Sequence, residues 1–343
     1  MEFINTTELD TIIDRSFTPE GLGLGELTMQ ALRGELDLSL GNIFSWILSA
    51  IFYETTILLH IIRYLLVVAI LSALFKAMTS SFKTSGVAEL GFYISCVLII
   101  GLLFSSFSLA LGIMNAMVSS VVMLLTGSTP FIIAAVAGSG YVASASAFAP
   151  TIIFAASGLT VFIERFLAPI IVVSAALHLI SFLLGKDKLE ALSDFLKDSI
   201  KFGLKSSAGV FIFVLSMQRL ASPILNNLAI RSARFTVGAV PVVGGALQGA
   251  IDAAIYYGAA ARGALAVGLI IAAVLVSIVP IIQLLAFVIV YRLSAALIQP
   301  LCDERIVKAM AAAAKYAQLM LGLSVLVAFL FIFIVLATLT ISN

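Results

Sequence analysis

The chain has 343 residues, of which 62% are hydrophobic and only 11% are charged, and its formal net charge is +1. Soluble domains carry roughly a quarter charged residues, so this composition excludes an ordinary soluble enzyme or binding domain. No basic patch with interleaved aromatic residues is present, which argues against nucleic acid as a partner. We therefore expect an all-α polytopic membrane protein.

Residues 1–56 are predicted to form an acidic N-terminal region outside the cytoplasm. This region has nine acidic and two basic residues. Within it, residues 36–52 are apolar and contain Trp46, a residue type that favours the membrane interface. Because this apolar stretch is short for a spanning helix, we interpret it as an interfacial helix.

Residues 57–343 are predicted to be the membrane domain, with about six full spans. A span needs about 20 apolar residues. Apolar runs occupy residues 57–79, 90–114, 148–184, 206–225, 264–299 and 318–341. Two of them, 148–184 and 264–299, are too long for one crossing of a ~30 Å hydrocarbon core. We place a division near Pro169 in the first, and Pro280 stands in the middle of the second.

Two further stretches, residues 126–146 and 226–254, combine apolar residues with glycine and proline. The second also contains charged residues. Interrupted backbone at membrane depth is tolerated only where protein or a water-filled cavity surrounds it. We therefore expect two broken elements of re-entrant or hairpin form.

The proline positions suggest an internal repeat of about 111 residues. The same spacing of 111 residues separates Pro130 from Pro241 and Pro169 from Pro280. The copies would cover roughly residues 57–165 and 166–278, with a partial copy at 279–343. The alternative is chance similarity among apolar segments; the matched prolines, glycines and charged links favour a duplication.

Lysine and arginine are concentrated in three links between spans, near residues 76–89, 185–205 and 300–316. The positive-inside rule places these links in the cytoplasm, and both termini then lie outside it. The link at 185–205 has leucine and isoleucine at helical spacing with charges on the other face, which predicts a surface helix.

The sequence carries none of the common catalytic motifs. It contains no HExxH, P-loop or GxSxG pattern. We expect no enzymatic activity, no cofactor and no metal site. His60 and His178 are expected to be buried or interfacial histidines.

Candidate conduit or interface residues are those that are costly or unusual inside a membrane. Charged groups need a partner or water there, and glycine rows allow helices to approach closely. Broken helices often surround transport sites. The candidates are Pro130, Gly138, Gly140, Arg219, Asn226, Asn227, Arg231, Arg234, Pro241, Gly244, Gly245, Gly249 and Asp252. For Asp252, a helix cap or a structural ion pair with a nearby arginine is equally compatible with the sequence.

The stretch RSARFTVGAVPVVGGALQGAIDAA resembles the signature of the stage III sporulation protein AE family. LDLSLGNIFSWIL near the start and SAALIQPLCDERIV near the end resemble the same family. Two positions depart from the usual pattern: Ala239-Val240 replaces Asn-Phe, and Gln248-Gly249 replaces Ser-Asp.

The resemblance implies a role in endospore formation. It implies a non-enzymatic, permease-like membrane component of the channel that links mother cell and forespore, in the mother-cell membrane around the forespore. Expected partners are membrane lipid and the other channel subunits, with a homo-oligomer left open. Two alternatives stay open: an autonomous secondary transporter of a small molecule, and a membrane scaffold for the assembly of partner ring proteins.

Overall fold

A computed structural model describes residues 85–141, 157–159, 161–184, 190–238, 244–300 and 303–339, together with residues 63, 67, 70, 74, 145, 150, 151 and 154. All regular structure in this part is helical. The elements are α4 (Ser85–Gly138), the π-helical turn η1 (Ile163–Leu167), α6 (Ala168–Leu184), α7 (Glu190–Gly238), α8 (Gly244–Ile298) and α9 (Glu304–Leu339). The predicted all-α class is confirmed for these residues.

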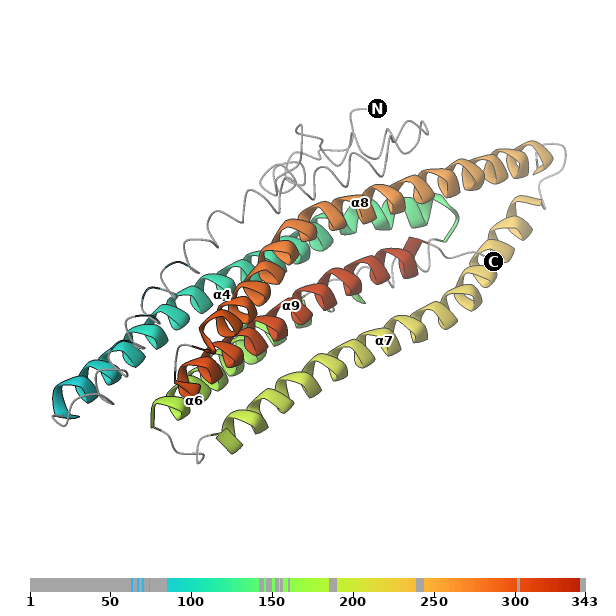
Figure 1. The fold of residues 1–343 in the computed structure, drawn as a ribbon. Coiled ribbons are helices and arrows are strands. Elements are labelled where there is room, and N and C mark those ends of the chain that lie inside the picture. Colours follow the sequence, from blue (N-terminus) through green and yellow to red (C-terminus); the bar gives the residue numbers. More distant parts are fainter. Residues whose placement is uncertain are drawn as a thin grey trace.

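The helices form an elongated bundle in which neighbours along the chain run in opposite directions (Figure 1). We call the end that holds the starts of α4, α7 and α9 the link end. The opposite end, where α4 and α7 finish, is the break end. At the link end α6 ends and α7 begins, and α8 ends and α9 begins; α7 ends and α8 begins at the break end.

Helix α9 lies at the centre of the bundle and packs against α4, α6, α7 and α8. After Lys315 the helix carries no charged residue, and Met320, Leu323 and Val327 are completely buried there. Nearer the link end, Ala309, Ala313 and Ala317 are buried at four-residue spacing. Small residues at this spacing let helix backbones approach closely, which explains how one helix contacts four others.

Four helices in the described part are long and apolar enough to cross a membrane, and they include residues Tyr93–Gly138, Ser157–Phe182, Ile255–Ile298 and Glu304–Ala337. At about 1.5 Å per residue, each exceeds the ~30 Å needed to cross a hydrocarbon core. The predicted span at 57–79 lies outside the described residues, apart from four isolated positions. The six spans and the 111-residue repeat stay predictions.

The prolines expected to interrupt or divide apolar stretches do not end the helices that contain them. Pro130 and Pro280 lie inside the continuous helices α4 and α8. Membrane helices tolerate proline because neighbouring groups and local adjustments satisfy the freed carbonyl. Pro169 is the second residue of α6, directly after η1. The π-helical turn already interrupts the ordinary hydrogen-bond ladder, so the missing N–H of this proline removes no further α-helical bond.

The two predicted broken stretches each contain the end of a helix, although not in the expected place for the first. Helix α4 continues past Pro130 to Gly138, and the interruption is a turn at Ser139 and Gly140. In the second stretch, α7 ends at Gly238 and α8 begins at Gly244. Pro241 lies between them, outside the described residues.

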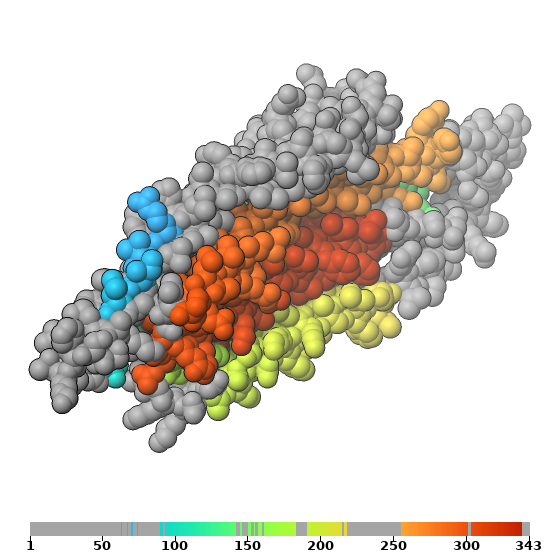
Figure 2. All heavy atoms as spheres, in the orientation of Figure 1, coloured from blue at the N-terminus to red at the C-terminus, as the bar shows by residue number. Residues whose placement is uncertain are grey.

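The predicted surface helix at 185–205 is not a separate element. Residues 190–205 are the first turns of α7, which continues without interruption to Gly238. This helix lies along one edge of the bundle (Figure 2). Its amphipathic start therefore leads directly into the apolar run at 206–225.

Candidate functional site

Two of the predicted site glycines form the turn that ends α4. Gly138 is the last helical residue, and Gly140 adopts a positive φ of 86°. A β-carbon on Gly140 would lie 3.1 Å from the side chain of Ile255, in α8. A positive φ is strained for L-residues with side chains, so glycine is the residue that suits this turn. The structure thus brings Gly138 and Gly140 against α8.

The contact with α8 depends on Gly258 and Arg262, which the sequence analysis did not select. A β-carbon on Gly258 would overlap the backbone carbonyl group of Gly138. One turn further along α8, Arg262 is only 8% exposed, and its guanidinium carbon lies 5.2 Å from the ring centre of Tyr141. This distance allows a cation–π interaction. The signal available in the sequence was a glycine and an arginine four residues apart in an apolar run.

The other predicted site residues do not join this contact in the described part. Pro130 lies within α4 with its ring exposed. The backbone of α7 carries Arg219, Asn226, Asn227, Arg231 and Arg234, and that of α8 carries Gly244, Gly245, Gly249 and Asp252. Their side-chain positions and Pro241 lie outside the described residues.

A buried polar cluster joins three helices near the link end. It consists of Ser174 and His178 of α6, Ser193 of α7 and Tyr316 of α9, all at most 4% exposed. The Tyr316 hydroxyl lies 2.8 Å from Ser174 Oγ and 2.7 Å from Ser193 Oγ. Nδ1 of His178 lies 2.8 Å from Ser193 Oγ and 3.3 Å from the Tyr316 hydroxyl.

The number of protons in this cluster favours one tautomer of His178. Ser174 Oγ donates to the Ser193 carbonyl at 3.0 Å, and Ser193 Oγ donates to the Ser174 carbonyl at 3.1 Å. The Tyr316 hydroxyl can then donate to only one of the two serine oxygens. A proton on Nδ1 of His178 supplies a fourth donor, directed at Ser193 Oγ. We therefore assign the Nδ1–H tautomer to His178. The hydrogen bonds of the cluster connect α6 to α7 and α9.

A second buried hydroxyl pair lies beside this cluster. The hydroxyl of Tyr291 in α8 is 2.7 Å from Ser106 Oγ in α4. The neighbouring Phe107 meets the ring of Tyr316 edge-on, with centres 6.4 Å apart and an interplanar angle of 88°. In the described part of the bundle near the link end, polar contacts thus join α4 to α8, and α6 to α7 and α9. These partners stand far apart in the sequence, so the sequence analysis could place only the burial of His178, which is confirmed.

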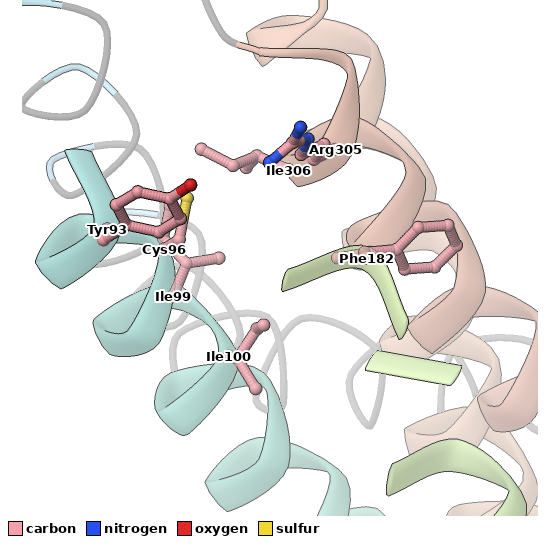
Figure 3. Close-up of a pocket in the computed structure, with 8 residues that line it drawn as sticks. Tyr93, Cys96, Ile99, Ile100, Phe182, Arg305 and Ile306 are labelled. Carbon is pink, nitrogen blue, oxygen red and sulfur yellow. The ribbon is translucent and has the colours of Figure 1, made fainter. Parts of the chain in front are cut away.

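A narrow pocket lies between α4, α6 and α9 close to the link end (Figure 3). Cys96, Ile99 and Ile100 line it from α4, Phe182 from α6, and Arg305 and Ile306 from α9. The lining is mainly apolar. Among the described residues, no group of three or more His, Cys, Asp or Glu could hold a metal ion.

The family model described as Stage III sporulation protein AE matches residues 23–342. Stage III sporulation protein AE of Bacillus subtilis (strain 168) is 25% identical over 276 residues, which make up 80% of this chain and 69% of that protein. No solved structure matches the chain. Since the family model spans nearly the whole sequence, the chain belongs to the stage III sporulation protein AE family.

Proposed function

We propose that this protein is a non-enzymatic, permease-like membrane component of the channel or secretion complex that links mother cell and forespore. Membership of the sporulation family and four helices long and apolar enough to cross a membrane support the coarser role of a sporulation membrane component. The finer role rests on the break end of the bundle. Its partners would be membrane lipid, further channel subunits and other copies of the chain.

The observation that carries the proposal is the buried Arg262 beside the interruption after α4. This residue lies within a 44-residue apolar helical segment and packs over Tyr141. An ionised group inside a membrane protein costs several kcal/mol unless it is paired or hydrated, so such groups are typical of transport pathways. Interrupted helices beside such groups are also typical of transport sites.

We further propose that the link end faces the cytoplasm and that both termini lie outside it, in a multi-pass cell-membrane protein. Five lysines stand near the link end of α7 and α9: Lys197, Lys201, Lys205, Lys308 and Lys315. The positive-inside rule favours the cytoplasm for this end. The final described helix finishes at the opposite end.

The test is complementation of a sporulating strain that lacks the gene. Arg262→Gln is expected to lower spore yield while the membrane level of the protein stays the same. Arg292→Gln is the matched control, because Arg292 is exposed and bonds Gln318 at 2.9 Å on the outside of the bundle. Normal spore yield from Arg262→Gln would overturn the role of the break end.

Reconstitution separates the channel component from an autonomous transporter. For a channel component, purified protein alone in liposomes passes no substrate, and flux requires the other subunits. Substrate flux by the purified chain alone would instead identify a transporter.

A scaffold is the second candidate, and the outer face of α7 favours it. Phe195 and Phe202 are 67% and 72% exposed on the charged first turns of this helix, which lies at the edge of the bundle. Exposed aromatic residues among charges are typical of protein contacts. If Phe195→Ser with Phe202→Ser abolishes sporulation while Arg262→Gln does not, the scaffold role is the correct one.

A further inference from the structure

Two oppositely charged side chains lie next to each other on the outside of the bundle, in the turn η1. Glu164 and Arg165 are both exposed, and they stand inside the apolar helical segment Ser157–Phe182. Ser119 Oγ of α4 donates a hydrogen bond to the carboxylate of Glu164 at 3.2 Å, so α4 lies beside the turn. Among the described residues, Arg165 has no salt-bridge partner.

The rest of this segment packs toward α7 and the core, which leaves the two charges on the outside. Phe154, Leu159 and Phe162 line a groove against α7. Within η1, Ile163 and Leu167 are buried in the core. The charged side of the turn therefore faces neither α7 nor the interior of the bundle.

The part of α4 beside this turn presents small and polar residues outward. Gly112, Asn115, Ala116 and Ser119 follow one another at helical spacing, which places them on one face of α4. Gly112, Ala116 and Ser119 are exposed, and a β-carbon on Gly112 would meet no atom within 4 Å. The row stands near the middle of the apolar segment Tyr93–Gly138. Small residues in such a row allow another membrane helix to approach closely.

Asn115 adds an unsatisfied amide to the same face. Its side-chain oxygen has no hydrogen-bond partner among the described residues. The oxygen and nitrogen of an amide exchange places when the group rotates, so this acceptor can also be directed outward. Side-chain amides form hydrogen bonds between neighbouring membrane helices, and Asn115 is placed to do so.

The charges on this face are complementary to those of a second copy of the same face. Charged groups inside a membrane need a partner or water. Glu164 and Arg165 cannot serve each other fully, because adjacent residues of a helix do not face each other. In a two-fold dimer, residue i of one copy contacts residue j of the other, and j contacts i. A two-fold axis along the membrane normal keeps both copies in the same orientation, with equivalent residues at the same depth.

We propose that this face joins two copies of the chain within the membrane, with Glu164 of each copy paired with Arg165 of the other. The small row of α4 lies at the same contact and lets the two copies approach closely. A different membrane protein would need to present both an acid and a base at this depth. The inference rests on the proposed function for its membrane placement, and it does not depend on transport activity.

Disulfide cross-linking of the purified full chain in liposomes measures this contact. Ala116→Cys is introduced together with Cys96→Ala and Cys302→Ala, which removes both native thiols. Two copies with different affinity tags are reconstituted at a high ratio of lipid to protein and then oxidised. We expect cross-linked pairs that carry both tags. Val274→Cys, on an exposed position of α8, should give none.

Reversal of a single charge tests the two ion pairs. Glu164→Arg gives each copy two adjacent basic residues, and Arg165→Glu gives each copy two adjacent acidic residues. Either change should reduce the cross-linked fraction at least about tenfold, because like charges that face each other oppose association. In an equal mixture the two variants are again complementary, so cross-linking between them should return to the wild-type fraction. Such rescue also requires that both variants are folded.

Glu304 and Arg305 supply the matched control, because they are the same two residue types, adjacent and exposed, at the start of α9. Glu304→Arg and Arg305→Glu should leave the cross-linked fraction unchanged. Gly112→Leu fills the small row, and it should lower the cross-linked fraction without lowering the melting temperature. Gly322→Leu, at an exposed glycine of α9 with equally open space, should change neither quantity.

Unchanged cross-linking after both charge reversals in η1 would overturn the proposal, and so would a loss that the mixture does not restore. If position 116 in membranes of sporulating cells links only to a different protein, the second copy is the wrong partner. Where a charge reversal lowers the melting temperature, the two leucine variants decide the question. Extraction of the protein from membranes by alkaline carbonate would contradict the proposed function as well, whereas an integral protein without this cross-link contradicts only the dimer.

Discussion

Gly258 of α8 lies directly against the backbone carbonyl group of Gly138, the last residue of α4, with no space for a β-carbon between them. Two helices in contact through glycine gain close packing that any side chain would prevent. We predict that Gly258→Ala destabilises the protein by about 1–3 kcal/mol, as overpacking does elsewhere. Thermal unfolding in detergent, followed by circular dichroism, measures this loss.

Gly263→Ala is the control for that substitution, because it lies in the same helix and its β-carbon would meet nothing within 4 Å. Replacing glycine by alanine inside a helix should raise stability by about 0.5–1 kcal/mol. Equal melting temperatures for the two alanine variants would contradict the close approach of α4 and α8.

The turn at Gly140 makes a second prediction, which separates backbone strain from crowding. Gly140→Ala should destabilise by about 1–2 kcal/mol because φ is positive, with an added contact 3.1 Å from Ile255. Asparagine accepts this backbone conformation more readily. Gly140→Asn should therefore unfold at a temperature between those of the wild type and Gly140→Ala. If Gly140→Asn is less stable than Gly140→Ala, then crowding against Ile255 outweighs the gain from a side chain that accepts positive φ.

Removal of the Tyr316 hydroxyl tests the polar cluster. This oxygen contacts Ser174 and Ser193 and lies near His178, so Tyr316→Phe leaves buried polar groups with fewer partners. We expect a loss of about 1–3 kcal/mol in the free energy of unfolding. Tyr291→Phe removes a hydroxyl with one described partner, Ser106, and should cost less. Chemical denaturation of both variants in the same detergent gives the comparison, and the reverse order would contradict the assignment.

The ion pair of Asp194 and Lys197 predicts how stability depends on pH. The hydrogen bond from Lys197 holds the pKa of Asp194 below its ordinary value of 3.8, and the same bond raises the pKa of Lys197 above 10.5. The stabilisation by Asp194 is therefore complete above its ordinary value and is lost as the pH falls through the lower folded value. The stabilisation by Lys197 is complete below its ordinary value and is lost as the pH rises through the higher folded value.

Asp194→Asn should consequently cost less than about 1 kcal/mol at pH 7, because the carboxylate is about half exposed. The difference from the wild type should stay constant from pH 5 to pH 9, an interval within those two ordinary values, and disappear in strong acid. Urea denaturation at a series of pH values measures it. A difference that changes between pH 5 and pH 9 would contradict the assignment of this stabilisation to the ion pair.

Membrane class and helical content were predictable from the sequence because apolar composition and periodicity fix them locally. The positions of the helix ends were not. Pro130 was expected in a broken stretch and Pro169 near a division between two spans, yet α4 and α8 continue through Pro130 and Pro280, and Pro169 lies at the start of α6 within one helical segment. Whether a proline ends a membrane helix depends on neighbours that satisfy the freed carbonyl, and those neighbours are set by tertiary packing.

The candidate site shows the same limit. Gly138 and Gly140 were predictable because glycine pairs mark interruptions. Their partners Gly258 and Arg262 lie more than a hundred residues away, inside a run that reads as an ordinary apolar helix. Ser193 and Tyr316 were missed for a similar reason. A serine or tyrosine in an apolar helix can be assigned a structural role only when the fold shows which partners other helices bring within hydrogen-bond distance.

The π-helical turn η1 also sets the rotational orientation of the preceding helical segment relative to α6. Phe162 and Leu167 are five residues apart, and both would contact a β-carbon on Gly203. An α-helix brings residues three or four apart onto one face, so the turn acts as a one-residue insertion. Deletion of one codon within residues 163–167 would restore ordinary winding and rotate the preceding segment by about 100° relative to α6. Phe154, Leu159 and Phe162 would then face away from α7, so this single extra residue aligns the two halves of the segment.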